Sequence, residues 1–210
     1  LAELRVGVVG LGAAGTAIAR MFGEVCETPV LGSDPNPDAQ ERLRGLGGEP
    51  AELADLMKRV DLAIAVTGRA GLIEPGMIRR GQGVFALTNP APEITPEDAL
   101  RGGAAFAADG RSVNNLLGFP GILRAAVDVR ASRITQSMYV SAARAIAALA
   151  RDDELVPSPL RLEVHRSVAR AVAQAAEKAG VARVPVPSDY QLDVPFQELR
   201  GGRSGLDDAS

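Results

Sequence analysis

The stretch "RVGVVGLGAAGTAIARMF", residues 5–22, decides the fold. It begins with a short apolar run, residues 4–10, of the kind found in buried parallel strands. A glycine turn follows, and residues 14–24 then place Ile18, Met21 and Phe22 at helical spacing. Strand, glycine turn and helix in this order predict the start of a dinucleotide-binding unit.

The turn "GLGAAG" has the spacing G-x-G-x-x-G, and each position has a physical task. Gly10 permits the tight turn, Gly12 lets the backbone approach a pyrophosphate, and Gly15 allows the helix to pack closely on the strand. Ala13 and Ala14 leave the first helical turn uncluttered, so that its free N–H groups face the phosphates. The alternative is a tight turn alone, because the chain has 23 glycines and the spacing by itself is a weak signal.

Asp34 closes the next expected strand, residues 28–34. A carboxylate there accepts hydrogen bonds from both ribose hydroxyls of NAD and repels a 2′-phosphate, which favours NAD over NADP. In the alternative, Arg42 or Arg44 on the helix expected over 38–47 reaches a 2′-phosphate, and the cofactor is NADP.

The rest of the chain alternates strands with helices. Strands are expected over 61–68, 83–90 and 104–110. Helices are expected over 50–60, with Pro50 at its entry, and over 95–103, with Thr95 as N-cap, and a helical turn over 74–81. This alternation predicts an α/β fold of Rossmann type, with a doubly wound, mostly parallel sheet and helices on both faces.

Extra C-terminal helices are expected over 114–127, 134–150 and 162–179. We expect residues 1–180 to form one dinucleotide-binding domain. Residues 181–210 are rich in Pro, Gly and Asp, which predicts an irregular tail.

Ligands of open parallel sheets bind beyond the carboxyl ends of the strands. Thr67 and Gly68 follow one expected strand, where a small residue lets a cofactor pass. Thr88 and Asn89 follow the next, and an Asn side chain that donates and accepts suits a carboxamide or a hydroxy acid. In the alternative, Asn89 caps its turn through an Asx interaction.

Asn114 and Asn115 open an apolar helix, where they could bind a ligand or serve only as N-caps. His165 is the only histidine and shares a helix face with Val168 and Val172, so we expect it to pack rather than catalyse.

Composition excludes several classes of protein. The net charge of −3 argues against nucleic-acid binding, and no apolar run approaches the roughly 18 residues of a membrane span. Cys26 is the only cysteine and is expected to pack, and no residues show metal-ligand spacing. Without a signal segment, a cytoplasmic location is expected.

The combined motifs resemble the NAD-binding domain of bacterial malic enzymes. The resemblance is carried by "VVGLGAAGTAIARMF", "ALTNPAPEITPEDAL", "ADGRS" and "VNNLLGFPGILRAAVDVRASRIT", and it extends over about residues 5–180. It implies oxidative decarboxylation of L-malate to pyruvate and CO2 with reduction of NAD or NADP. It also implies that Asn89 and one of Asn114 and Asn115 contact malate.

The resemblance places the catalytic tyrosine and lysine, and the ligands of a divalent Mg or Mn ion, in a portion that precedes the glycine turn. Tyr139, Tyr190, Lys58 and Lys178 lie in other segments, so we expect no catalytic or metal-binding residue in this chain. The family also has several residues between "GRS" and "VNN", which are adjacent here.

The resemblance therefore implies the cofactor-binding part of a malic enzyme, inactive by itself, lacking an N-terminal catalytic domain and acting as a homo-oligomer. Two alternatives stay open from the residues: an NAD-sensing or interaction module without catalysis, and a metal-independent Rossmann dehydrogenase, for which His165 would be the only histidine available as base.

Overall fold

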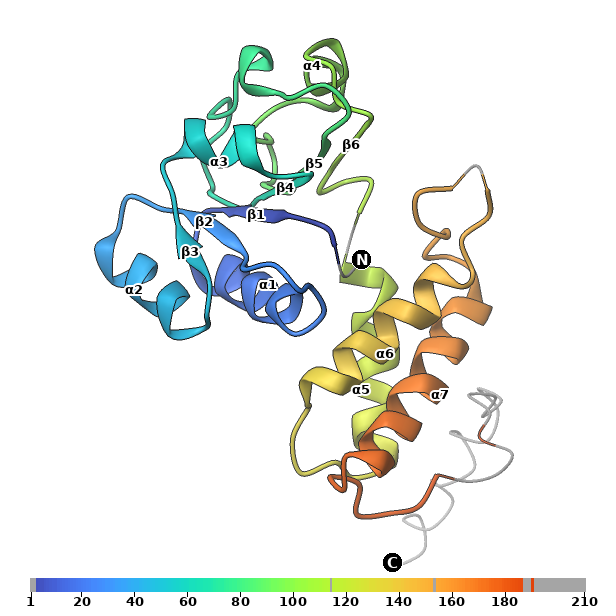
Figure 1. Ribbon diagram of the computed structural model, residues 1–210. Helices are drawn as coiled ribbons and strands as arrows, with labels where there is room; N and C mark the ends of the chain where they lie inside the picture. The colour runs from blue at the N-terminus through green and yellow to red at the C-terminus, as the bar shows by residue number, and fades with distance from the viewer. Residues whose placement is uncertain (1–2, 114, 153, 187–189, 191–210) are drawn as a thin grey trace, which may run out of the picture. The chain divides into compact units, whose positions relative to one another are not determined.

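The computed structural model describes residues 3–113, 115–152, 154–186 and 190. The chain divides between Asn114 and Asn115 into two compact units, and each is described by itself. The first unit holds a sheet with its covering helices, and the second holds a group of helices (Figure 1).

The sheet of the first unit is parallel throughout, in the order β3-β2-β1-β4-β5-β6. Its strands are β1 (Val6–Val9), β2 (Leu31–Ser33), β3 (Glu49–Pro50), β4 (Leu62–Ala65), β5 (Gly83–Ala86) and β6 (Phe106–Asp109). All four residues of β1 and of β4 are buried, as expected for strands covered on both faces. The predicted Rossmann-type fold is confirmed.

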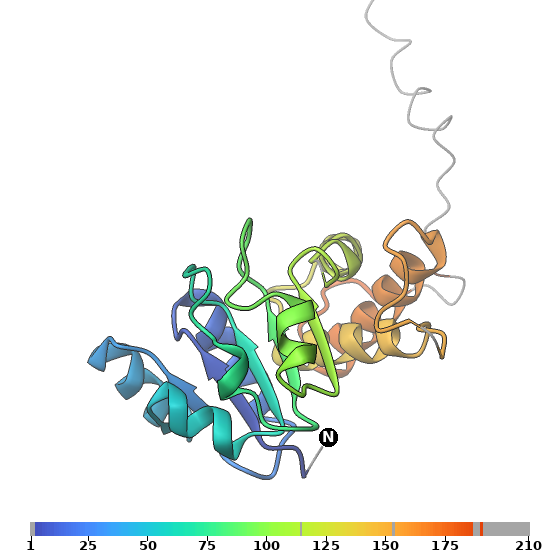
Figure 2. The same cartoon turned by 90° about the horizontal axis from the view of Figure 1, so that it is seen from above.

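Helices cover both faces of this sheet (Figure 1). They are α1 (Ala13–Gly23), α2 (Pro37–Gly45), α3 (Leu53–Arg59) and α4 (Pro96–Arg101), with a 3-10 turn η1 (Pro75–Met77). Figure 1 shows α1 and α2 on one face and α3 and α4 on the other, and Figure 2 shows the latter pair in front of the strands. Thr95 is the N-cap of α4, as predicted, and accepts a hydrogen bond from the Asp98 N–H (3.1 Å).

Two aliphatic cores hold the layers together. The core beneath α1 and α2 includes Val8, Ala19 and Leu43, and the core beneath α3 and α4 includes Leu56 and Ala99. Each of these five side chains is at most 2% exposed. Small side chains let the layers approach closely, so a chain with only 3% aromatic residues still builds a dense interior.

The strand β3 was not predicted, and the expectation that Pro50 enters a helix is wrong. The N–H of Glu49 donates to the Val30 carbonyl (2.9 Å) and that of Ala51 to the Gly32 carbonyl (2.8 Å), so this segment pairs with β2. Pro50 has no N–H and cannot donate a hydrogen bond within the sheet, which is tolerated here because β3 is an edge strand. The helix α3 begins three residues later, at Leu53.

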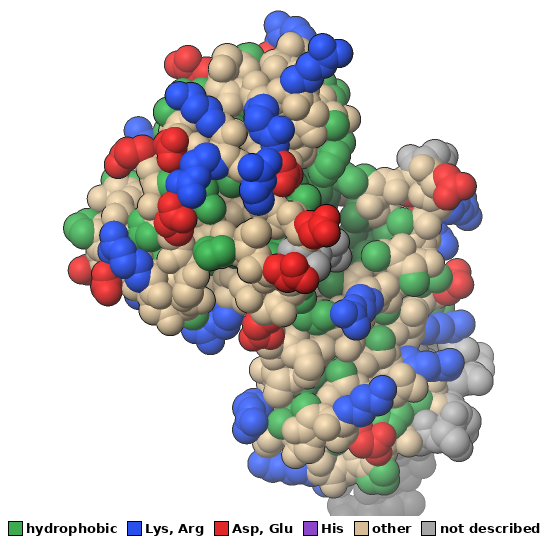
Figure 3. Space-filling view, in the orientation of Figure 1, with side chains coloured by type: hydrophobic (Ala, Val, Ile, Leu, Met, Phe, Trp, Pro, Cys, Tyr) green, Lys and Arg blue, Asp and Glu red, His purple; other side chains and the backbone are tan. Residues whose placement is uncertain are grey.

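A charge cluster lies at the opposite edge of the sheet from the carboxyl ends of the strands. Asp61, just before β4, accepts hydrogen bonds from the guanidinium groups of Arg5 (2.8 Å) and Arg79 (2.6 Å). These bonds, that with Arg5 foremost, hold the pKa of Asp61 well below its usual range. Figure 3 shows basic side chains interspersed with acidic ones over this unit.

The second unit is helical. It contains a 3-10 turn η2 (Asn115–Leu117) and the helices α5 (Phe119–Asp128), α6 (Gln136–Ala147) and α7 (Leu162–Lys178). The helix expected over 114–127 therefore starts later, at Phe119, because Gly118 is its N-cap and Pro120 lies in its first turn. N-capping of this helix by Asn115 is not observed, and Asn114 lies outside the described residues.

Close contact between α5 and α7 depends on Gly121. A Cβ atom there would lie 2.7 Å from Val168 Cγ1. His165, on the same helix as Val168, is half-buried, and its Nε2 lies 2.7 Å from the Pro159 carbonyl oxygen. This agrees with the expected packing role and leaves Nε2 engaged in a structural hydrogen bond.

Part of the predicted tail is anchored to this unit. Val181 is buried, and the Arg183 N–H donates to the Val129 carbonyl (2.9 Å). The Tyr190 hydroxyl donates to Asp128 Oδ2 (2.6 Å), and burial together with this carboxylate raises the pKa of Tyr190. The expectation of an irregular tail after residue 180 otherwise falls mostly outside the described residues.

Candidate functional site

The register of the sheet aligns the carboxyl ends of the strands. Val9 pairs with Ser33 and with Ala65, and Ala65 pairs with Ala86. The residues that follow β1, β2, β4 and β5 therefore meet at one edge of the sheet. Gly10, Asp34, Thr67 and Thr88 all lie there, as the sequence predicts.

The glycine turn has little room for side chains at its first and third glycines. Gly10 has φ +90°, and a Cβ atom on it would lie 2.9 Å from the Val66 carbonyl oxygen. A Cβ atom on Gly15 would overlap the Gly10 carbonyl oxygen, at 1.8 Å. The N–H of Gly10 donates to the Ser33 carbonyl (2.8 Å) and ties the turn to β2.

The second glycine faces open space. Gly12 is the N-cap of α1, with φ −67°, and a Cβ atom built on it meets no atom within 4 Å. No side chain caps the helix here, and no acidic residue lies in its first turn. Ala13 and Ala14 are exposed. The first N–H groups of a helix lack acceptors within it and carry a partial positive charge, so this end suits an anion.

Asp34 links the glycine turn to the end of β2. Its Oδ2 accepts from the Leu11 N–H (2.7 Å), and its Oδ1 accepts from the Asn36 N–H (2.8 Å). A carboxylate has about four lone-pair sites, so Asp34, which accepts these two hydrogen bonds, retains capacity to accept more. Asp34 can therefore shape the turn and still accept hydrogen bonds from ribose hydroxyls.

A cavity of about 640 Å³ lies beside the turn, within the first unit. The glycine turn and the end of β2 form one side of it, and the segments after β3 and β4 form the other. Its lining residues are Val9, Gly10, Gly12, Ser33, Asp34, Pro35, Gln40, Ala51, Glu52, Leu53, Val66, Thr67, Arg69 and Leu72. The volume is in the range of small-molecule and cofactor sites. Its apolar lining by Ala51, Leu53 and Leu72 was not predicted; Ala51 and Leu53 were missed because they follow the unpredicted strand β3.

The two arginines considered for a 2′-phosphate do not line this cavity. Arg44 is paired with Glu41 (2.9 Å) on the exposed side of α2. Gln40 takes the place nearest to Asp34, donating from Nε2 to the Asp34 carbonyl (2.8 Å).

Glu93, which sequence reasoning also missed, joins the ends of β4 and β5. It is fully buried. Its Oε1 accepts from the Thr67 N–H (2.6 Å), the Thr67 hydroxyl (2.8 Å) and the Thr88 hydroxyl (2.6 Å). Glu93 lies at the end of the turn segment "TNPAPE" after β5, and no local pattern there marks it as buried.

Asn89 is exposed at the carboxyl end of β5, and its side chain lies against Gly110. A Cβ atom at Gly110 would come within 2.6 Å of Asn89 Nδ2, so glycine makes room for the amide. Among the described residues Asn89 accepts no Asx hydrogen bond, which is contrary to the capping alternative. Asn115 lies in the second unit, exposed at the start of η2.

The motif "ADGRS" forms a tight turn after β6. Asp109 Oδ1 accepts from the N–H groups of Ser112 (2.9 Å) and Arg111 (3.0 Å) and from the Ser112 hydroxyl (2.9 Å). These bonds, led by that from the Ser112 N–H, lower the pKa of Asp109.

The described part of the chain contains no group of three His, Cys, Asp or Glu side chains arranged to hold a metal ion. No helix among the residues placed by the structure is long and apolar enough to cross a membrane.

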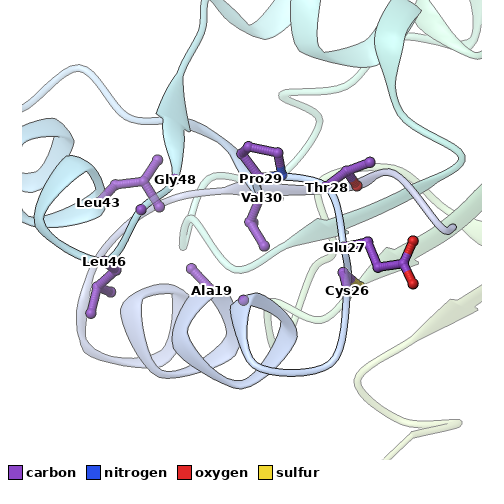
Figure 4. Close-up of a pocket in the computed structure, with 11 residues that line it drawn as sticks. Ala19, Cys26, Glu27, Thr28, Pro29, Val30, Leu43, Leu46 and Gly48 are labelled. Carbon is purple, nitrogen blue, oxygen red and sulfur yellow. The ribbon is translucent and has the colours of Figure 1, made fainter. Parts of the chain in front are cut away.

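A second cavity, of about 210 Å³, lies at the opposite end of β2 (Figure 4). Figure 4 shows Leu43 and Leu46 of the α2 segment on one side and Cys26 on the other, with Ala19 of α1 below. Burial raises the pKa of the Cys26 thiol, which makes it less reactive, in line with the expected packing role.

Comparison with known proteins gives one consistent result. The sequence profile of the NAD-binding domain of malic enzymes matches residues 59–181. NAD-dependent malic enzyme 1 of Bacillus subtilis is 50% identical over 177 residues, which cover 84% of this chain and 40% of that protein. An NADP-dependent malic enzyme of Halomonas elongata is 39% identical over 168 residues, 67% of this chain and 40% of that protein.

Solved structures agree. A malic enzyme from Pyrococcus horikoshii superimposes with a TM-score of 0.78 at 34% identity, covering 88% of this chain and 50% of that one. The NAD-dependent malic enzyme of Thermotoga maritima gives a TM-score of 0.72 at 33% identity, covering 81% and 52%. The chain thus spans about half the length, or less, of these relatives.

Proposed function

Because this chain belongs to the family of malic enzyme NAD-binding domains, we propose that it is the cofactor-binding part of an enzyme that converts L-malate to pyruvate and CO2. The observation that carries this proposal is the open helix start at Gly12 beside a cavity that also contains Asp34. Diphosphate and ribose, the two polar parts of a dinucleotide, find complementary groups there.

The lining of the cavity suits the parts of the cofactor in turn. The free N–H groups at Gly12, Ala13 and Ala14 would hold the diphosphate. The remaining lone pairs of Asp34 would accept the ribose hydroxyls. The apolar wall of Ala51, Leu53 and Leu72 would cover a flat base, since such sites are mostly apolar with a few placed polar groups.

We propose NAD as the preferred cofactor, with NADP as the alternative. Asp34 would repel a 2′-phosphate, and neither Arg42 nor Arg44 lines the cavity to attract one. Gln40 is neutral and already donates to the Asp34 carbonyl. The charges around Asp34 therefore favour a free ribose 2′-hydroxyl, as in NAD, over a 2′-phosphate.

For the substrate we propose Asn89 and one of Asn114 and Asn115 as hydrogen-bonding residues; Asn114 lies outside the described residues. When bound, NAD would supply the acceptor for the hydride that leaves the hydroxyl-bearing carbon of malate. Asn89, held against Gly110, presents an amide that can donate to a carboxylate and accept from a hydroxyl. Thr67 lines the cavity after β4, and the next residue, Gly68, is exposed.

The proposed reaction needs groups that the described residues do not bring together. The described residues do not fit a divalent metal site, and His165 Nε2 is engaged with the Pro159 carbonyl. We therefore propose that the acid, base and metal ligands lie in a separate catalytic portion, and that this chain alone does not turn over malate.

Fluorescence titration of the chain with NADH and with NADPH tests the proposal. Saturable NADH binding, tighter than NADPH binding, is the expected result, together with no NADH production from malate and NAD. Absence of NADH binding at millimolar concentration would refute cofactor binding, and malate turnover by this chain would refute the separate catalytic portion.

A further inference from the structure

Glu93 is the buried carboxylate between the ends of β4 and β5, and nothing in the proposed cofactor contacts uses it. Its exposed fraction is 0%, whereas glutamate is rarely buried without partners. Besides the three hydrogen bonds to Oε1, its Oε2 lies 3.4 Å from the Thr88 N. These contacts stabilise the carboxylate in its buried position, because a buried polar group without hydrogen bonds is costly.

The two threonine hydroxyls act as relays. A hydroxyl has one proton, and here each proton points to Glu93 Oε1, so the lone pairs face the loop after β4. Thr88 Oγ1 accepts from the Gly68 N–H (3.0 Å), and Thr67 Oγ1 accepts from the Arg69 N–H (3.0 Å). The Thr67 N–H therefore donates to Glu93 directly, and the N–H groups of Gly68 and Arg69 are linked to Glu93 through one threonine hydroxyl each.

The backbone on either side is tied in the same way. The N–H of Ile73 donates to the Glu93 carbonyl (3.0 Å), and that of Gly71 donates to the Pro92 carbonyl (3.1 Å). We refer to Thr67, Thr88 and Glu93 with these bonds as the carboxylate clasp. It fixes residues 67–73 to the segment that follows β5.

We propose that Glu93 is a positioning residue for the cofactor, and this rests on the proposed function. Thr67 and Arg69, which the clasp holds, line the cavity, and Gly68 between them leaves it open. Because the N–H groups of Thr67, Gly68 and Arg69 already have acceptors, the backbone of these three residues contributes shape rather than hydrogen bonds to the ligand. The clasp also sets the turn that begins at Asn89, four residues before Glu93.

The decisive variants are T88V and T88S. Val has the shape of Thr without the hydroxyl, so T88V leaves the Gly68 N–H without its acceptor and Glu93 without a donor. We expect NADH binding by this chain to weaken about tenfold. T88S retains the hydroxyl and should recover most of that loss.

E93Q tests the carboxylate itself. Its amide nitrogen would face the Thr88 N–H, donor against donor, so we expect a similar loss of NADH affinity. Since Thr88 and Glu93 are directly hydrogen-bonded to each other and act as one unit, the double variant E93Q/T88V should lose little more NADH affinity than either single variant. If the fold-losses of NADH affinity in T88V and E93Q multiplied in the double variant, the two residues would act independently, which would contradict the clasp.

Q82M is the matched control for a merely structural role. Gln82 is also fully buried, and it donates to the Met57 (2.9 Å) and Val60 (2.8 Å) carbonyls at the other end of β5. Q82M should lower the Tm and leave the Kd for NADH unchanged. The proposal is overturned if T88V behaves like Q82M, with a lower Tm and an unchanged Kd.

Amide hydrogen exchange separates this inference from the proposed function. In the unliganded chain, T88V should speed exchange at Gly68 relative to T88S, whether or not NADH binds. If wild type does not bind NADH, the proposed function fails, whatever the exchange shows. If wild type binds but exchange and Kd are the same in T88V and T88S, the clasp fails and the proposed function stands.

Discussion

Gly12→Ala separates what the glycine turn needs for folding from what it needs for binding. Gly12 has φ −67°, which alanine adopts without strain, and a Cβ atom there has no neighbour within 4 Å. Alanine is a poorer N-cap than glycine, at a cost below about 1 kcal/mol, but it restricts the unfolded chain by about 0.4–1 kcal/mol. The free energy of unfolding should therefore change by less than about 1 kcal/mol.

Binding should respond much more strongly. The added methyl group projects into the space where a diphosphate would approach the helix start, and it forces the ligand away from the N–H groups. Losing one charge-assisted hydrogen bond costs about 1.5–3 kcal/mol, which is about a tenfold to hundredfold rise in Kd. NADH fluorescence titration measures the Kd, and urea unfolding measures the stability.

Gly15→Ala is the comparison variant. Its Cβ atom would overlap the Gly10 carbonyl oxygen, and overpacking of this kind costs about 3 kcal/mol or more when backbone must move. Thus G15A should lower the free energy of unfolding, whereas G12A should raise only the Kd for NADH. Wild-type NADH affinity in G12A would refute the assignment of this helix start as the phosphate site.

Three further predictions concern cofactor choice, pH and substrate. Asp34→Ser should lower the preference for NADH over NADPH at least about tenfold, since the carboxylate that repels a 2′-phosphate is gone; titration with both cofactors measures this. Asp61→Asn should cost about 1 kcal/mol at pH 7. Because folding lowers the pKa of Asp61, this stabilisation is present above about pH 4 and is lost as the pH falls further. Urea unfolding should therefore show a smaller difference in stability between wild type and D61N at pH 3 than at pH 7. Equal differences at the two pH values would contradict the ion-pair explanation. In the complete enzyme, Asn115→Ala should lower kcat/KM for malate at least about tenfold and leave the Kd for NAD unchanged, whereas unchanged malate kinetics would exclude Asn115 as a substrate ligand.

Local patterns were enough to predict the Rossmann-type sheet. Strands such as β1 and β4 are short apolar runs bounded by turn residues, a pattern that predicts a buried strand. Thr95 precedes a proline and an acidic first turn, a pattern that predicts the start of helix α4. The two-residue strand β3 has no periodicity to detect, because its existence depends on backbone pairing with β2.

The site was partly predictable for the same reason. Gly10, Gly12, Gly15 and Asp34 sit in one continuous motif with known spacing. The role of Glu93 was not predictable, because a glutamate in a polar turn is typically exposed. Two of its donors come from Thr67, 26 residues earlier, and the parallel register of β4 and β5 brings the two segments together.

The hydrogen bond from the Leu11 N–H to Asp34 has a consequence for redesign of the cofactor preference. Asp34, the side chain that would discriminate between NAD and NADP, also holds the glycine turn in place. That turn would bind the diphosphate, which both dinucleotides contain. An exchange that removes the acceptor oxygen at this position trades selectivity against total affinity, because the Leu11 N–H then loses its acceptor. A switch to NADP would therefore need two coordinated changes: a cation for the extra phosphate and a new acceptor for the amide of Leu11.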